Sequence, residues 1–183
     1  MQFTIKSKDL NQAAIKAIQD RFGDANLVIN VAQESNLDSL TEEQCWRLID
    51  LLDWDASDDD DRVIAPLVKE LANENISHIY QFADWLAQKL WLLDTPAHAE
   101  NLIKQDGFLS VDDFLYARCA VVANGKVYFD SVLKNPTRFP TTVTFLPLLH
   151  TPLIAYQQKK GEEIVYVPLY NYETYGNKTA WGR

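Results

Sequence analysis

The densest group of chemically active side chains is a cluster of aspartates. Seven lie between residues 50 and 61, namely Asp50, Asp53, Asp55, Asp58, Asp59, Asp60 and Asp61. Aspartates at a helix start are favoured by the helix dipole, but four adjacent carboxylates exceed what capping requires. We therefore predict that the six aspartates from Asp53 to Asp61 form a docking surface for a basic protein partner. The alternative is a solvated charged face that only begins a helix.

The aspartate cluster could in principle bind calcium. The segment Asp53-Trp54-Asp55-Ala56-Ser57 imitates the alternating oxygen ligands of an EF-hand loop. However, Asp58 stands where the turn glycine is required, and Glu70 comes too late to supply the closing bidentate ligand. We predict no metal at this cluster.

A second group of candidates surrounds Arg118. This arginine lies in the apolar run LYARCAVVA, which predicts partial burial. A buried guanidinium needs a carboxylate partner, or it binds a phosphate or carboxylate of a ligand. Asp94 and His98 are four residues apart across a helix start and could form a carboxylate–imidazole pair. A helical pocket holding Arg118, Asp94, His98 and Asp112 is thus the enzymatic alternative, and a structural ion pair between helices is the simpler one.

The remaining reactive residues form no recognisable catalytic or metal-binding motif. The chain has no GxGxxG, GxxxxGK[ST], HExxH or GxSxG sequence. His78, His98 and His150 fall on three different predicted helices, and Cys45 and Cys119 stand alone as expected buried thiols. We therefore predict no catalytic residues and no cofactor, and the prediction for enzymatic activity leans towards none.

Composition places the chain among soluble globular proteins. Its 183 residues are 47% hydrophobic, and 17 Lys and Arg against 26 Asp and Glu give a net charge of −9. The acidic balance argues against nucleic acid as a partner, because phosphate binding relies on basic side chains. No signal peptide and no stretch of membrane-spanning length is apparent, which predicts a cytoplasmic protein without a membrane partner. Most aromatic residues, Trp54 included, are expected in the core, although a tyrosine-rich tail could form an adhesive surface.

The residues that precede the linker at 33–40 predict a small β-α-β unit. Segments 2–6 and 26–32 alternate apolar and polar residues, and a helical pattern that stops at Gly23 separates them. We place this lead at residues 1–35 and a mainly helical domain at 41–183. The predicted class is α+β, with the lead packed on a helical bundle and a C-terminal strand around 164–167 that could complete it.

The second domain shows repeated helix-start signals. Thr41 and Gln44 form a capping box, Thr95 precedes a proline at the first helical position, and Ser110 begins another helix. About six helices are expected, of which the one over 143–158 is predicted to be broken or kinked by Pro147 and Pro152.

One connection allows two structures. Asn124-Gly125 between β-prone residues is the preferred turn of a β-hairpin. The same pair can end one helix and let a second begin, with Gly125 adopting a left-handed conformation. The upstream helix start and the spacing of Tyr128, Val132 and Leu133 favour the helix–turn–helix, but the sequence leaves both open.

Several separated strings together resemble a known family. They are Trp46-Arg-Leu-Ile-Asp50, Leu92-Leu-Asp-Thr-Pro-Ala-His98, Phe114-Leu-Tyr-Ala-Arg-Cys-Ala-Val-Val-Ala-Asn-Gly125 and Tyr170-Asn-Tyr-Glu-Thr174. From about residue 40 onward the chain resembles the bacterial domain-of-unknown-function family number forty-two-forty, and the lead resembles an extension carried by some members. The resemblance implies a bacterial, largely helical protein. It supplies no catalytic residues.

Three functions remain compatible with these observations. The first is a non-catalytic acidic binding protein, most concretely an immunity-type inhibitor of a basic bacterial toxin, because an acidic surface speeds the binding of a cationic partner. The second is an enzyme of unrecognised type built around Arg118. The third is a scaffold or regulatory domain for a partner from the same operon. The sequence does not specify the oligomeric state.

Overall fold

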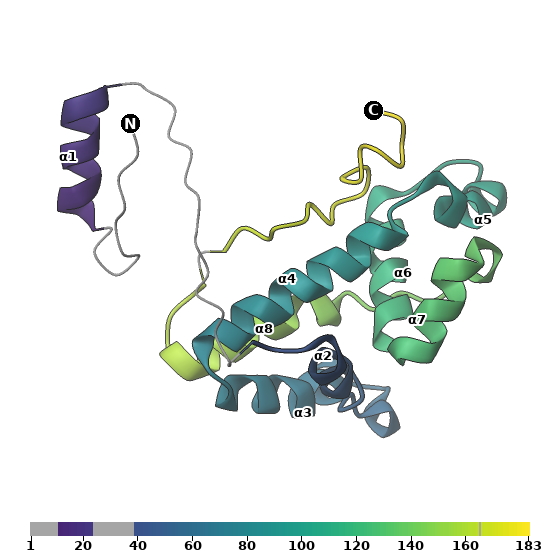
Figure 1. Cartoon of the computed structure of the whole chain (residues 1–183). Helices are drawn as coiled ribbons and strands as arrows, with labels where there is room; N and C mark the ends of the chain where they lie inside the picture. Colours follow the sequence, from purple (N-terminus) through teal and green to yellow (C-terminus); the bar gives the residue numbers. More distant parts are fainter. Residues whose placement is uncertain (1–10, 24–38, 165) are drawn as a thin grey trace. The chain divides into compact units, whose positions relative to one another are not determined.

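The described part of the protein is entirely helical. Figure 1 shows the computed structural model, which describes residues 11–23, 39–164 and 166–183. These residues contain eight α-helices, two short 3₁₀-helices and no strand. The α+β prediction is therefore wrong for the described residues, and the class there is all-α. The strands predicted at 2–6 and 26–32 lie outside the described residues.

The strand predicted around 164–167 is not formed at the positions that are described. Ile164, Tyr166 and Val167 belong to no strand. Ile164 and Tyr166 instead lie against α4 (Ile76–Leu93) and α8 (Pro147–Lys160). Alternation of side chains predicts an extended backbone, but a strand also needs a neighbouring strand to bond with.

The chain divides into two compact units, Met1–Leu37 and Asp38–Arg183. In the first unit the structure describes α1 (Gln12–Phe22). The side chain of Asn11 accepts a hydrogen bond from the Ala14 N–H at 3.0 Å, and Gly23 ends the helix, as the sequence predicted. None of the residues in α1 is buried.

The second unit is a bundle of seven α-helices. Its further elements, in order, are α2 (Glu42–Ile49), η2 (Trp54–Ala56), α3 (Asp60–Asn73), α5 (Pro96–Asp106), α6 (Val111–Ala123), α7 (Gly125–Lys134) and η3 (Pro136–Arg138), with α4 following α3 and α8 last. The predicted starts are confirmed: Thr41 and Gln44 form a complete capping box, and Thr95 and Ser110 each cap a helix through the side chain.

Helix α6 lies at the centre of the core. From Phe114 to Ala123 every residue except Tyr116 is buried, so α6 is surrounded by other elements. It packs against α4, α7 and α8, while α3 lies along α8 (Figure 1). The hydrophobic core therefore brings the middle and the end of the chain together around one helix.

The helix–turn–helix reading of Asn124-Gly125 is confirmed. Helix α6 ends at Ala123 and α7 begins at Gly125. Gly125 has φ +84°, a left-handed conformation that glycine adopts without steric cost. The Asn124 side-chain amide also donates to the Ala120 carbonyl at 2.8 Å, which accepts from the Asn124 backbone N–H as well.

The predicted break at Pro152 does not occur. Helix α8 starts at Pro147, where proline is tolerated, and continues through Pro152 to Lys160. Because Pro152 lacks an N–H, the carbonyl four residues earlier, that of Leu148, loses its helical partner. The hydroxyl of buried Thr151 donates to this carbonyl at 2.9 Å instead. This replacement bond allows the helix to continue.

None of the helices in the described residues combines the length and the hydrophobicity that a membrane crossing requires.

Candidate partner-binding surface

The six predicted docking aspartates lie on the connection between α2 and α3 and in the first turn of α3, and all of them are exposed. We call this set, Asp53, Asp55, Asp58, Asp59, Asp60 and Asp61, the acidic surface. Two of its members have a structural role. Asp53 accepts from the Asp55 N–H at 3.2 Å, and Asp59 caps α3 by accepting from the N–H groups of Asp61 and Arg62 at 3.1 and 3.2 Å.

Capping does not account for the other four carboxylates. The side chains of Asp55, Asp58, Asp60 and Asp61 make no hydrogen bond or ion pair to any described residue. Residues 50–62 contain seven aspartates and one arginine, so six of the chain's nine excess negative charges are concentrated there. Within the described ranges, no three His, Cys, Asp or Glu side chains are arranged to hold a metal ion.

Apolar side chains are exposed within the acidic surface. Trp54 is 44% exposed and Leu51 is 39% exposed. The indole of Trp54 packs against Phe145, with ring centroids 5.1 Å apart, which restricts its motion. Trp54 is an exception to the prediction that the aromatic residues are mostly core, and its two aspartate neighbours in the sequence were the available signal of a surface position.

Arg118 lies in the core, away from this surface. Its side chain is fully buried in α6. One terminal nitrogen, Nη1, donates to the carbonyls of Leu90 and Tyr172 at 3.0 and 2.9 Å, and Nη2 donates to the Thr174 hydroxyl at 3.0 Å. The expected ion pair is not formed, because no carboxylate of the described residues lies within 4.0 Å. Nε has no partner there either.

Two features make a charged group tolerable at this buried position. Leu90 is in the last turn of α4, where carbonyls lack helical partners and a cation is favourable. The guanidinium also lies 4.7 Å from the centre of the Phe114 ring. Burial lowers the pKa of Arg118 to about 10, while the nearby Asp94 opposes this shift. Arg118 therefore stays charged at neutral pH.

Asp94 binds the C-terminal tail, not His98. The fully buried carboxylate accepts from the N–H of Tyr175 at 3.2 Å, the N–H of Asn177 at 2.9 Å and the indole N–H of Trp181 at 3.0 Å. Arg118 and Asp94 thus fasten the same tail from two helices. We call these two residues the tail clasp.

A glycine allows the tail to turn tightly next to Asp94. A Cβ at Gly176 would lie 2.2 Å from the Asn171 carbonyl oxygen and 2.8 Å from that of Glu173. Any larger residue would force backbone atoms apart. Sequence reasoning did not single out Gly176, and its position within the tyrosine-rich tail was the only local hint.

His98 is buried as a neutral group in α5. Its Nε2 lies 3.3 Å from the Val132 carbonyl, which can only accept, so Nε2 carries the proton. Nδ1, 2.7 Å from the Thr95 hydroxyl, then accepts from that hydroxyl. The pKa of His98 is lowered, chiefly because burial disfavours the charged ring. Nε2 therefore joins α5 to α7, whereas Nδ1 bonds to the residue that caps its own helix.

This burial predicts a pH dependence of stability. Because the folded-state pKa of His98 lies below its unfolded value of about 6.5, the unfolded chain binds more protons in that range. The contribution of neutral His98 to the free energy of unfolding is complete above pH about 6.5 and is lost as the pH falls through the folded-state pKa.

Urea unfolding between pH 5 and 7.5 should show a free energy of unfolding that rises with pH. The H98Q variant should reduce the slope of this free energy against pH. The exposed His150, changed to Gln, is the matched control. An equal slope in H98Q would contradict the assignment.

The four residues of the enzymatic alternative do not form a pocket. Arg118, Asp94 and His98 are buried and bonded to other parts of the protein, whereas Asp112 is exposed in the first turn of α6. None of the four lines the two hollows that Leu153 and Ile164 border. A substrate could reach the buried three only after the tail had detached. We therefore assign Arg118, Asp94 and His98 a structural role.

Lys89 and the two cysteines are also buried. Lys89 forms an ion pair with Glu42 at 2.8 Å and lies 5.7 and 5.8 Å from the ring centres of Trp85 and Phe129. It thereby links α4 to the first turn of α2. Cys45 and Cys119 are buried free thiols, as predicted, and burial raises the pKa of each to about 12.

Residues from three of the four strings that carry the sequence resemblance meet at the tail clasp. Asp94 comes from one string, Arg118 from another, and Tyr172 and Thr174 from the last. No curated protein and no solved structure matches the chain. The family described as "Protein of unknown function (DUF4240)" matches residues 40–174, most of the chain, and confirms the resemblance. The chain therefore belongs to the DUF4240 family.

Proposed function

We propose that this chain is a non-catalytic binding protein that takes up a basic protein partner on the acidic surface between α2 and α3. The observation that carries the proposal is the exposed Trp54, which stands among carboxylates that have no partner in the described residues. Tryptophan is the residue type most enriched among those that dominate binding energy. A surrounding rim of one charge selects and orients the partner.

The charge distribution supports a basic partner. Six excess negative charges over thirteen residues create a local field that attracts cationic proteins and raises their association rate. Asp55, Asp58, Asp60 and Asp61 are exposed, and binding a partner does not require them to leave a bond to any described residue. Trp54, held by Phe145, offers a fixed apolar contact in the same place. The carboxylates would then determine the association rate of the basic partner, and the contact with the Trp54 indole would determine the dissociation rate of the complex.

The most specific form of the proposal is an immunity-type inhibitor of a basic bacterial toxin, acting in the cytoplasm. Such an inhibitor needs no catalytic group of its own, since it works by covering the toxin. A small acidic chain with a concentrated binding surface suits fast capture of a cationic enzyme. A partner that lacks toxin activity would instead favour the scaffold or regulatory function.

The test begins with a pull-down from a bacterial host that carries the gene, followed by binding measurements on the purified partner. Changing Asp58–Asp61 to Asn raises the net charge from −9 to −5, and asparagine at position 59 still caps α3. We expect this variant to bind at least about tenfold more weakly and with a smaller salt dependence. W54A should weaken binding about 30-fold, equivalent to about 2 kcal/mol.

A control of equal charge separates the surface from the net charge. Changing the exposed Asp106, Asp112 and Asp113 to Asn and Glu162 to Gln also gives −5. This variant should bind like the unmodified chain, apart from a small change in association rate. If both variants lose the same affinity, or if W54A binds normally, the acidic surface is not the binding site.

A further inference from the structure

The tail contains an uncharged segment, residues 166–172, which has no regular secondary structure and bends at Leu169 and Tyr170. We call it the tail segment. Its side chains alternate: Tyr166, Pro168, Tyr170 and Tyr172 are half-buried, whereas Val167 and Leu169 are 85% and 79% exposed. Val167 and Leu169 are two residues apart, and no charged residue lies between them. Neighbouring apolar side chains that are this exposed are unusual on the surface of a monomer.

The inner side chains hold the tail segment firmly on α4. The Tyr166 hydroxyl donates to the Asp84 carboxylate, which also accepts from the Leu169 N–H at 2.9 Å. The Tyr170 hydroxyl accepts from Gln88 at 3.0 Å, and its ring packs on Trp91. The segment therefore presents Val167 and Leu169 in a fixed position.

The backbone of the tail segment has no neighbouring strand. None of its N–H or C=O groups bonds to another backbone group of the described residues. Two of these groups bond to side chains: the Leu169 N–H donates to Asp84, and the Tyr172 carbonyl accepts from Arg118. Backbone groups without a bond in the described residues can pair with a second segment.

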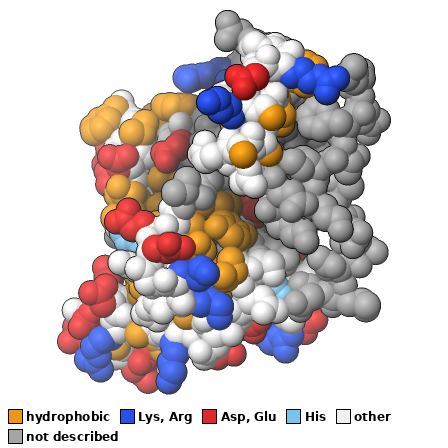
Figure 2. All heavy atoms as spheres, turned by 90° about the vertical axis from the view of Figure 1, so that its left-hand side faces the viewer, with side chains coloured by type: hydrophobic (Ala, Val, Ile, Leu, Met, Phe, Trp, Pro, Cys, Tyr) orange, Lys and Arg blue, Asp and Glu red, His pale blue; other side chains and the backbone are white. Residues whose placement is uncertain are grey.

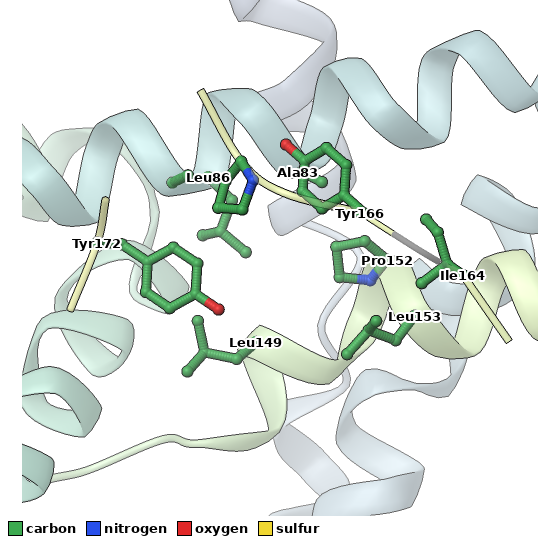
Figure 3. A pocket seen from close by; sticks show the side chains of 10 residues that line it. Ala83, Leu86, Leu149, Pro152, Leu153, Ile164, Tyr166 and Tyr172 are labelled. Atoms are coloured by element: carbon green, nitrogen blue, oxygen red, sulfur yellow. The ribbon is translucent and has the colours of Figure 1, made fainter. Parts of the chain in front are cut away.

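An apolar hollow of about 100 Å³ lies beside the segment (Figure 3). Tyr166 and Tyr172 form one wall, Leu149, Pro152 and Leu153 of α8 form the opposite wall, and Leu86 of α4 closes it. Pockets for drug-sized ligands measure about 300–1000 Å³, so this one suits a single aliphatic side chain. Leu153, 45% exposed, lies at its rim. Figure 2 shows one face of the molecule, on which hydrophobic side chains are exposed among charged ones.

The charge distribution indicates which partner can approach this region. From Gln157 to the C-terminus there are four basic and three acidic side chains, so this part is nearly neutral in a chain of −9. A second copy would be repelled by the acidic surface but not here. A two-fold interface also requires projecting and receiving features on the same patch, and the tail segment borders its own hollow.

We propose that the protein forms a two-fold symmetric dimer through the tail segment. The two tail segments lie antiparallel, as a two-fold axis requires, and Val167 and Leu169 of each copy pack against the tail segment and hollow of the other. The acidic surface, on the connection between α2 and α3, takes no part in this contact. The dimer is independent of the proposed partner binding.

Sedimentation of the full chain tests the dimer over a range of about 1 to 100 μM. We expect a species of twice the 21.0 kDa chain mass, with association unchanged or strengthened between about 50 and 500 mM NaCl, because salt screens the repulsion between two acidic chains. Changing Val167 and Leu169 to Asp should weaken association at least about tenfold, because like charges would then face each other across the two-fold axis.

The matched control changes Val127 and Val143, which are 86% and 51% exposed, to Asp. This variant adds the same charge elsewhere and should remain dimeric. Thermal unfolding shows whether each variant is folded. A monomeric wild-type chain at about 100 μM would overturn the proposal. So would a dimer that survives V167D/L169D, or one that the control weakens equally.

Discussion

Replacing Arg118 with methionine should lower the free energy of unfolding by about 3 kcal/mol. Methionine fills much of the volume of the arginine stem but donates no hydrogen bond. The carbonyls of Leu90 and Tyr172 and the hydroxyl of Thr174 would lose their donor inside the protein. Such a loss is a large share of the 5–15 kcal/mol that stabilises a typical domain.

Urea unfolding measures this loss, and trypsin cleavage after the exposed Lys178 reports locally on the tail. Cleavage there should be faster in R118M, because the tail is held less firmly. R118K keeps the charge but cannot form all three bonds at once, so it should fall between wild type and R118M. If R118M is as stable as wild type and its tail is equally resistant, the bonds from the guanidinium do not stabilise the fold.

The second large effect is expected at Asp94. D94N should lose about 2–3 kcal/mol although it preserves the shape of the side chain. The side-chain oxygen of Asn at position 94 can still accept from Tyr175 and Trp181. Its amide nitrogen, however, would then face the N–H of Asn177, and two donors cannot form a hydrogen bond with each other. The change also removes the charge that opposes the burial of Arg118.

Unfolding by urea, together with the fluorescence of Trp181, checks this prediction. D113N is a suitable control, since Asp113 is an exposed aspartate at a helix start. It should lose less than about 1 kcal/mol. Because Arg118 and Asp94 fasten one tail, the double variant should lose less than the sum of the two single losses. Fully additive losses would mean that the two residues act independently.

The helices of this protein were largely predictable because their start signals are local. Thr41, Thr95 and Ser110 each bond to a backbone N–H three residues later, a contact that requires only the right residue at the right spacing. The same locality explains why Gly125 indicated a left-handed junction between two helices. Near neighbours determine these features, and the sequence displays near neighbours directly.

The tail clasp and the path of the tail could not be predicted in the same way. Arg118 bonds to residues 54 and 56 positions later, and Asp94 to residues more than 80 positions later. The apolar run around Arg118 indicated burial but not the partner. Likewise, the proline at 152 predicted a broken helix because the compensating bond comes from the side chain of Thr151, which the general rule does not consider.

The candidate binding surface was only partly predictable. The charge cluster was evident from composition, and the structure places all six aspartates in solvent. Trp54 was assigned to the core because tryptophan is large and mostly apolar. Its exposure depends on the short 3₁₀ turn that Asp53 begins, which positions the indole against Phe145 and leaves its other side open.

Hydrogen exchange of the full chain, free and bound to its purified basic partner, tests the central claim most directly. If the acidic surface and Trp54 form the binding site, backbone amides of residues 50–62 should exchange more slowly in the complex, and those around the tail clasp should be unchanged. Slower exchange confined to α5, α6 or the tail segment, with residues 50–62 unaffected, would contradict the account.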